Sequence, residues 1–242
     1  GHDNKSCFWI KNFLTDRSQQ VKLNASLSSS RLVTSGVPQR SVLSPTLFLL
    51  YINDLLEIGI HSHVYLFADD VKLFNNSSNH GILASDLNLI SEWSKKWQLH
   101  VSIPKCTVLY LGRKNPKHVY ELSGHSLAND NTEAKDIGVI VDKTLSFSPH
   151  CSNIVKKAKV ISRLITRAFI SRDPEVLLKA FLVYVRPILE YASVVWNPYL
   201  IKDISAIESV QRRFTKKILA NKTLTYAQRL KHFSVESLEK RR

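Results

Sequence analysis

Two short apolar runs, HVYLF at 63–67 and VKLF at 71–74, flank an Ala68-Asp69-Asp70 tripeptide. Runs of this length, rich in β-branched and aromatic residues and joined by a short polar link, predict a β-hairpin with the acidic pair at its tip. A hairpin tip in water usually carries Asn-Gly or Asp-Gly, because these residues tolerate positive φ. The tripeptide contains no glycine, so ease of turning alone does not explain its sequence.

The two neighbouring carboxylates at this tip repel each other, and a divalent cation would relieve the repulsion. Mg²⁺ prefers oxygen ligands and usually keeps several waters together with the phosphate oxygens of a substrate. Carboxylates on a rigid tip therefore suit phosphoryl transfer by two metal ions held about 3.5–4 Å apart. For an isolated Asp69-Asp70 pair, a solvated polar turn is the simpler alternative.

The first 149 residues mix helical patterns with strand-like runs, and Ser44-Pro45 predicts a helix start with the serine as N-cap. Beyond them only helical patterns remain, and Asp203 is predicted to cap one of these helices. In 154–169, apolar residues line one side of a helix and cations line another. These cations are Lys156, Lys159, Arg163 and Arg167. The sequence thus predicts an α+β chain with a domain boundary near 145–150.

Positive charge is concentrated in the helical part of the chain. The net charge is +14, and residues 150–242 hold 19 basic and 7 acidic side chains against 15 and 13 in residues 1–149. This distribution indicates either a polyanion-binding lobe or a solvated basic surface. A membrane partner is disfavoured, because no segment pairs the charge with an exposed Trp, Phe or Leu face and no apolar run reaches the ~18 residues that span a bilayer. Three scattered cysteines indicate a reducing, intracellular compartment.

The acidic tip is one of several motifs that occur in a fixed order. They are Ser35-Gly36-Val37-Pro38-Gln39-Arg40-Ser41-Val42-Leu43-Ser44-Pro45, LFLLYINDL, Phe67-Ala68-Asp69-Asp70, Trp93-Ser94-Lys95-Lys96-Trp97, Pro104-Lys105-Cys106, Asp136-Ile137-Gly138-Val139, Leu145-Ser146-Phe147 with His150, Val185-Arg186-Pro187 with Leu189-Glu190-Tyr191, and Val210-Gln211-Arg212-Arg213-Phe214. In order and spacing these motifs resemble the reverse transcriptases of non-LTR retrotransposons, of the jockey and CR1-like kind. The resemblance extends over about residues 8–220.

This resemblance implies an RNA-directed DNA polymerase that extends a DNA primer on an RNA template with dNTPs and Mg²⁺ or Mn²⁺. By position, Asp69 matches the direct metal ligand and Asp70 the supporting carboxylate. The implied architecture is a partial polymerase palm in 1–148, an antiparallel sheet flanked by helices, followed by a helical basic thumb in 149–242. The parent protein is expected to act on chromosomal DNA in the nucleus, and the sequence gives no oligomeric state.

The resemblance also assigns the loop that lies against the incoming nucleotide. Gly36, Pro38 and Gln39 match that loop, where glycine allows close backbone approach, proline stiffens the turn and the amide offers hydrogen bonds. An ordinary Gly-Pro turn is the alternative. Phe67 is either a nucleotide contact or a buried strand residue.

Three further assignments follow by position. Lys105 matches a lysine near the departing pyrophosphate, where a cation would stabilise developing negative charge, and a solvated lysine is the alternative. The Ile137-Gly138 pair matches the turn that grips the primer strand. The four cations of 154–169 match thumb residues that would contact the phosphates of the template–primer duplex. Such contacts position the duplex and do not read its sequence. A solvated helix face is the alternative for those cations.

The chain departs from the family pattern in three ways. The family's metal site uses another aspartate on an upstream strand that would precede Gly1, so the chain is expected to be a C-terminal fragment with little or no activity alone. Arg40 stands where the family usually has glycine, and Ser102 where it has asparagine. Two alternatives to an enzyme therefore stay open: a catalytically dead remnant that binds nucleic acid, and an unexpressed gene fragment.

Overall fold

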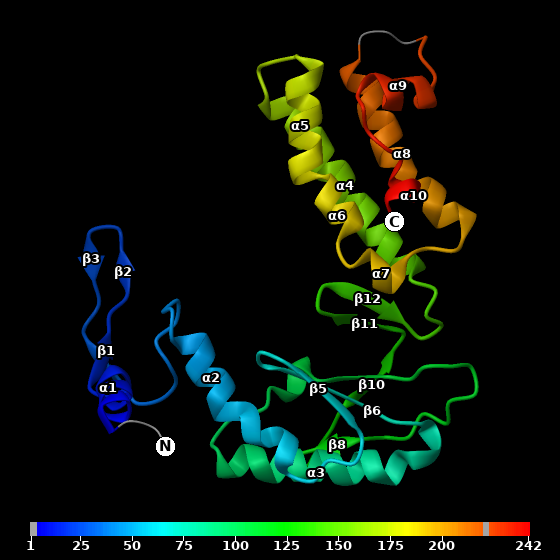
Figure 1. Ribbon diagram of the computed structural model, residues 1–242. Helices are drawn as coiled ribbons and strands as arrows, with labels where there is room; N and C mark the ends of the chain where they lie inside the picture. Colours follow the sequence, from blue (N-terminus) through cyan, green and yellow to red (C-terminus); the bar gives the residue numbers. More distant parts are fainter. Residues whose placement is uncertain (1–3, 220–222) are drawn as a thin grey trace. The chain divides into compact units, whose positions relative to one another are not determined.

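The computed structural model describes residues 4–219 and 223–242 of the chain (Figure 1). The chain forms two compact units, one of residues 1–101 with 121–124 and the other of residues 102–120 with 125–242. Both combine helices with short strands, which confirms the predicted α+β class. The strands of the described residues pair two by two. The predicted division at 148/149 into palm and thumb differs from these units and stays a prediction.

The first unit runs from a helix through short strands to a hairpin and a long helix. Its elements are α1 (Asn4–Leu14), β1 (Arg17–Gln19), β2 (Lys22–Leu23), β3 (Ser26–Leu27), β4 (Arg31–Val33), α2 (Ser44–Ile52), the 3₁₀ turn η1 (Asn53–Glu57), β5 (His63–Phe67), β6 (Asp70–Phe74), η2 (Ser77–Asn79), α3 (His80–Lys96) and β8 (Glu121–Leu122). Antiparallel pairs join β1 to β4, β2 to β3 and β5 to β6.

The core of the first unit lies between α3, the end of α2 with η1, and one face of the β5–β6 hairpin. Its buried residues are Ile52, Leu55, Ile90 and Trp93. The hairpin packs the partly buried side chains of Leu66 and Leu73 against this cluster. The fully buried carboxylate of Asp86 on α3 accepts the backbone amides of His61 (3.1 Å) and Ser62 (2.8 Å), which fixes the chain where β5 begins.

The second unit starts with short strands and continues as helices. Its elements are η3 (Ile103–Lys105), β7 (Thr107–Leu109), β9 (His125–Ser126), β10 (Ala128–Asn131), β11 (Glu133–Asp136), β12 (Val139–Asp142), α4 (Ser148–Ala168), α5 (Pro174–Tyr184), α6 (Arg186–Glu190), α7 (Ser193–Trp196), α8 (Ile201–Ile218), α9 (Tyr226–His232) and α10 (Leu238–Arg241). β7 and β10 pair in parallel, whereas β11 and β12 form an antiparallel hairpin.

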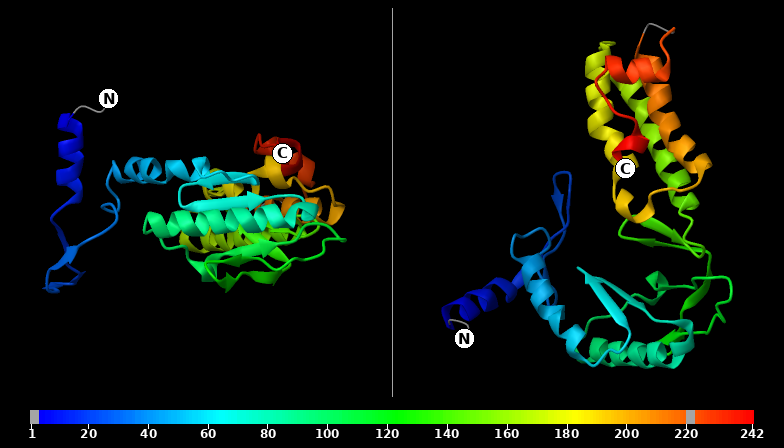
Figure 2. Two further views of the ribbon diagram at one scale, coloured as in Figure 1. Left: turned by 90° about the horizontal axis from the view of Figure 1, so that it is seen from below. Right: turned by 45° about the vertical axis from the view of Figure 1, so that its right-hand side comes forward.

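The helices α4, α5 and α8 run side by side in the second unit (Figure 2) and enclose its core. Phe181, Ile207 and Phe214 are among the buried residues, and Val139 of β12 joins the same cluster. The predicted cap role of Asp203 is wrong: Leu200 precedes α8 as its N-cap residue, and the buried Asp203 accepts a hydrogen bond from the Ser148 hydroxyl (2.5 Å). None of the described helices is both long and apolar enough to cross a bilayer.

Candidate active site and nucleic-acid interface

The β5–β6 hairpin carries the acidic pair at its tip, as the sequence predicts. The two strands pair from His63 opposite Phe74 to Phe67 opposite Asp70, which leaves Ala68 and Asp69 as a two-residue turn. Ala68 has a φ of 52°, a left-handed conformation that L residues adopt at some cost. Asp70 is the first residue of β6, so the two carboxylates differ in their backbone setting.

The hairpin has an inner face on the core and an outer face in solvent. On the outer face, Phe74 stacks with His63 at 4.8 Å and with Tyr65 at 5.7 Å between ring centroids. Side chains alternate along a strand, so Phe67 and Asp70 share this outer face. Phe67 is 59% exposed, which shows that its alternative interpretation as a buried strand residue is wrong.

Asp69 and Asp70 are both exposed, and neither side-chain carboxylate has a hydrogen-bond or ion-pair partner among the residues that the structure describes. Two adjacent, unpaired carboxylates fit a hard cation that completes its shell with water and phosphate oxygens. In the described part of the chain, no group of three or more His, Cys, Asp or Glu side chains could hold a metal ion. The pair can therefore supply part of a metal site.

The loop from Gly36 to Arg40 is anchored at two of its carbonyls. The Arg17 guanidinium donates to the Gly36 carbonyl (2.6 Å), and the Ser44 hydroxyl donates to the Pro38 carbonyl (2.5 Å). This second bond explains why the predicted N-cap role of Ser44 is wrong: α2 begins with Leu43 as N-cap residue, and the Ser44 side chain turns back to the loop. The anchored carbonyls leave the Gln39 side chain exposed.

Two residues of this loop have positive φ. Gly36 adopts 73°, and Arg40 adopts 63°. The left-handed region costs an L residue roughly 1–2 kcal/mol and costs glycine almost nothing. The Arg40 position therefore keeps a backbone conformation that suits glycine, although the chain places a long cation there.

The family described as "Reverse transcriptase (RNA-dependent DNA polymerase)" matches residues 2–144, which contain both the acidic hairpin and the anchored loop. The chain belongs to the reverse transcriptase family. It is 27% identical over 224 residues, 86% of the chain, to the probable RNA-directed DNA polymerase from transposon X-element of Drosophila melanogaster. It is also 27% identical over 226 residues to the RNA-directed DNA polymerase from mobile element jockey of Drosophila funebris. The chain spans about a quarter of the length of these relatives, 24% of each.

The resemblance to reverse transcriptases also singles out Lys105, Ile137 and Gly138, which lie in the second unit. Lys105 is exposed at the end of η3, where its backbone amide donates to the Ser102 carbonyl (2.9 Å). Ile137 and Gly138 form the exposed turn between β11 and β12. The acidic hairpin and the loop at Gly36 belong to the first unit.

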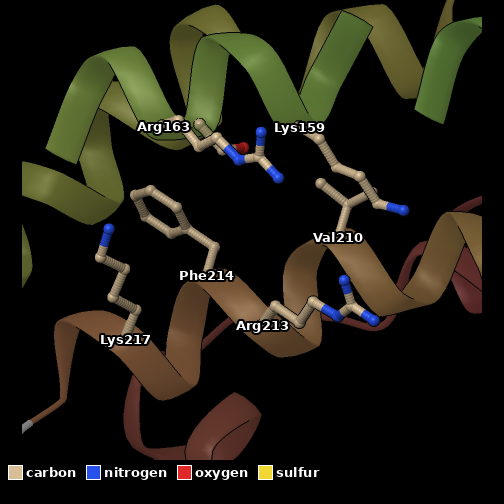
Figure 3. A pocket seen from close by; sticks show the side chains of 7 residues that line it. Lys159, Arg163, Val210, Arg213, Phe214 and Lys217 are labelled. Carbon is tan, nitrogen blue, oxygen red and sulfur yellow. The ribbon is translucent and has the colours of Figure 1, made fainter. Parts of the chain in front are cut away.

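A basic groove lies between α4 and α8 in the second unit. Figure 3 shows Lys159 and Arg163 on α4 facing Arg213 and Lys217 on α8, with Phe214 between them. The cavity has a volume of about 230 Å³, and its apolar floor is Val210 with Phe214. In each helix the two cations are four residues apart, about 6 Å along the axis. We call these four cations the groove cations.

The charge of the groove is not compensated by the acidic residues nearby. None of the described residues that line it is acidic. Glu208 on α8 is buried elsewhere, where it accepts the Tyr226 hydroxyl and the backbone amides of Leu238 (3.3 Å) and Glu239 (3.1 Å). Lys217 is tied to α4 by a hydrogen bond to the Thr166 hydroxyl (2.8 Å). The groove is therefore a preformed positive surface that suits phosphate groups.

The structure brings only part of the predicted cation stripe into this groove. Lys159 and Arg163 line it, whereas Lys156 and Arg167 are exposed outside it. Sequence reasoning missed the contribution of Arg213 and Lys217, because it depends on how two helices pack. Arg213 and Lys217 are four residues apart, as are Lys159 and Arg163, and this shared spacing could have indicated that the two pairs face each other.

Proposed function

We propose that the chain is part of the RNA-directed DNA polymerase of a mobile element, in which Asp69 and Asp70 hold the catalytic divalent cations. The observation that carries this proposal is the exposed, unpaired pair of carboxylates at the β5–β6 turn of a reverse transcriptase family member. Asp69, in the turn itself, is the direct ligand, and Asp70 on β6 supports it.

The proposed reaction is nucleotidyl transfer onto a DNA primer. The primer 3′-hydroxyl attacks the α-phosphate of a dNTP, a phosphodiester bond forms, and pyrophosphate leaves. When bound, Mg²⁺ or Mn²⁺ supplies positive charge that stabilises the attacking and leaving oxygens. The loop containing Gly36, Pro38 and Gln39 lies against the incoming nucleotide, and its anchored carbonyls reduce the ordering cost of binding. Phe67 contacts the same nucleotide, and Lys105 places a cation near the departing pyrophosphate.

The second unit, in this proposal, holds the RNA template and DNA primer. The groove cations contact phosphates of the duplex, and the Ile137-Gly138 turn contacts the primer strand. Lys156 and Arg167 on the exposed side of α4 add charge at longer range. Functionally, residues 1–148 act as a partial palm and residues 149–242 as a thumb.

A second candidate is a catalytically dead remnant that still binds nucleic acid. Two observations favour it: no third carboxylate joins the Asp69–Asp70 pair among the described residues, and Arg40 occupies a left-handed position in the nucleotide loop. Both weaken catalysis and leave the basic groove intact. On this account the 242-residue chain alone extends a primer slowly or not at all.

Primer extension on an RNA template tests the polymerase proposal. We expect little or no extension by the 242-residue chain, and extension by the longest open reading frame that includes it. Asp69→Asn should abolish that extension, whereas Asp16→Asn, a matched change at another exposed turn carboxylate, should preserve it. Extension that survives Asp69→Asn contradicts the proposed role of the pair. A stop codon directly upstream, together with retained duplex binding, would favour the remnant instead.

A further inference from the structure

The turn between β11 and β12 has a strained backbone at its tip. Asp136 pairs with Val139, so Ile137 and Gly138 alone form the turn, with φ values of 42° and 86°. Of the described non-glycine residues with positive φ, only Ile137 is β-branched. Positive φ in a β-branched residue is a genuine outlier, and such strain persists where the surroundings enforce it, often at functional sites. Ile137 is nevertheless 47% exposed, so core packing does not enforce its conformation.

Tyr191, the residue that follows α6, contacts both residues of this turn. Its hydroxyl donates a hydrogen bond to the Ile137 carbonyl oxygen (3.0 Å). Its ring lies against the Gly138 backbone, because a Cβ built on Gly138 would be only 3.3 Å from Tyr191 Cε1. Glycine at 138 is thus favoured twice: by its φ, and by the ring, which a Cβ would displace by a few tenths of an ångström.

A chain of contacts through Trp196 and His150 connects Tyr191 to β12, the strand that follows the turn. The Tyr191 carbonyl accepts the indole N–H of Trp196 (2.7 Å), and Trp196 packs against the His150 ring at 5.0 Å between centroids. His150 Nδ1 in turn accepts the backbone amide of Ile140 in β12 (3.2 Å). Trp196 and His150 are almost completely buried, at 0% and 2% exposure. The hairpin is therefore held at its turn and in its strand by one connected group of side chains, of which Trp196 and His150 are buried.

We propose that Tyr191 is a positioning residue that fixes the Ile137–Gly138 turn, so that the turn meets the primer strand as a rigid apolar tip. The inference rests on the proposed function, which assigns the primer contact to this turn. Without the tyrosine hydroxyl, the strained backbone at Ile137 loses a hydrogen bond that stabilises its conformation. The turn then samples other conformations, and the primer end loses its fixed support.

The groove cations, and not the turn, hold most of the duplex. Loss of the Tyr191 hydroxyl should therefore change the position of the primer end more than the affinity for the duplex. The groove cations contribute the salt-dependent binding, and Tyr191 carries no charge. Removing the hydroxyl therefore leaves the affinity for template–primer within about twofold. It should reduce specific contact between the primer end and the turn. If Tyr191 only stabilised the fold, its substitution would reduce the affinity for template–primer and the contact of the primer end with the turn together.

Two measurements on the 242-residue chain test the inference, with Tyr191→Phe as the probe and Tyr184→Phe, at an exposed tyrosine of α5, as the matched control. Amide hydrogen exchange reports the turn itself. We expect exchange at residues 136–139 to become about fivefold faster in Tyr191→Phe, because one neutral hydrogen bond contributes about that factor to the stability of a local conformation.

Photo-crosslinking from a 4-thiothymidine at the primer 3′ end, on an RNA template, reports the contact between the primer and the turn. We expect crosslinks at 136–139 in the unmodified chain and a severalfold lower yield in Tyr191→Phe.

Each outcome decides one part of the inference. Exchange at 136–139 that is equal in Tyr191→Phe, Tyr184→Phe and the unmodified chain would show that Tyr191 does not hold the turn. Faster exchange with no crosslink at the turn in the unmodified chain would overturn the primer contact, and hence that part of the proposed function, while leaving the contact between Tyr191 and the turn established. Faster exchange with a lower crosslink yield at unchanged affinity supports the whole inference.

Discussion

The basic groove predicts how binding of an RNA–DNA duplex depends on salt. Affinity falls as the salt concentration rises, and each phosphate contact made by Lys or Arg contributes about 0.9 to the steepness of this fall in log affinity against log salt concentration, here called the salt slope. Four groove cations therefore contribute a slope of about 3.6. Raising salt fourfold, from about 50 to 200 mM, should weaken binding by about 3.5-fold per contact and about 150-fold for all four.

The double substitution Arg163→Ala with Arg213→Ala removes one groove cation from each helix. Both side chains are exposed, so the effect on folding stability should stay within about 0.5 kcal/mol. The salt slope, measured by fluorescence anisotropy of a labelled heteroduplex, should fall by about 1.8. The matched control Lys156→Ala with Arg167→Ala removes the same charge from α4 outside the groove, and its slope should change by less than about 0.5. Equal slope changes in the two double variants would refute the groove as the binding site.

Three predictions concern the backbone and the titration of single residues. Arg40→Gly should raise the free energy of unfolding, measured by urea titration, by about 0.5–1 kcal/mol. The relief of left-handed strain at this position exceeds the entropy that glycine adds to the unfolded chain. An equal gain in Arg40→Ala would contradict this reason. Burial raises the pKa of Asp142, but hydrogen bonds from the Thr144 side chain and from backbone amides outweigh burial and lower the pKa to about 2. Stability from Asp142 is therefore present above the ordinary pKa of 3.8 and should be lost as pH falls toward 2, and Asp142→Asn should flatten this part of the profile. Gly138→Ala should destabilise the chain less in a Tyr191→Ala background than alone, and strict additivity in that cycle would contradict the ring contact.

The acidic hairpin could be predicted from sequence because its determinants are local. The alternating runs that flank Ala68 define the two strands, and a short link without other structure leaves only a turn between them. The fixed order of motifs predicted the family for the same reason, since each motif is a contiguous stretch of chain. The family usually has glycine at position 40, and glycine adopts positive φ readily, which is consistent with the left-handed backbone found at Arg40.

Features that depend on long-range packing could not be predicted in this way. Ser44 has the sequence of an N-cap, but its hydroxyl bonds the Pro38 carbonyl in the loop before it. Asp203 also has a capping pattern, but α4 packs close enough for Ser148 to bind its carboxylate. The groove requires the register of α8 against α4, which no single helix pattern contains. Local patterns thus identify each helix face, and only the packed structure shows which faces meet.

The central claim is that Asp69 and Asp70 hold a divalent cation, and paramagnetic broadening by Mn²⁺ in NMR spectra of the chain tests it most directly. Mn²⁺ broadens signals of nuclei close to it, so we expect the strongest broadening at the amides of residues 67–71. The double variant Asp69→Asn with Asp70→Asn should lose it, and the control Asp16→Asn should retain it. Broadening that is absent at residues 67–71, or unchanged in the double variant, would contradict the claim.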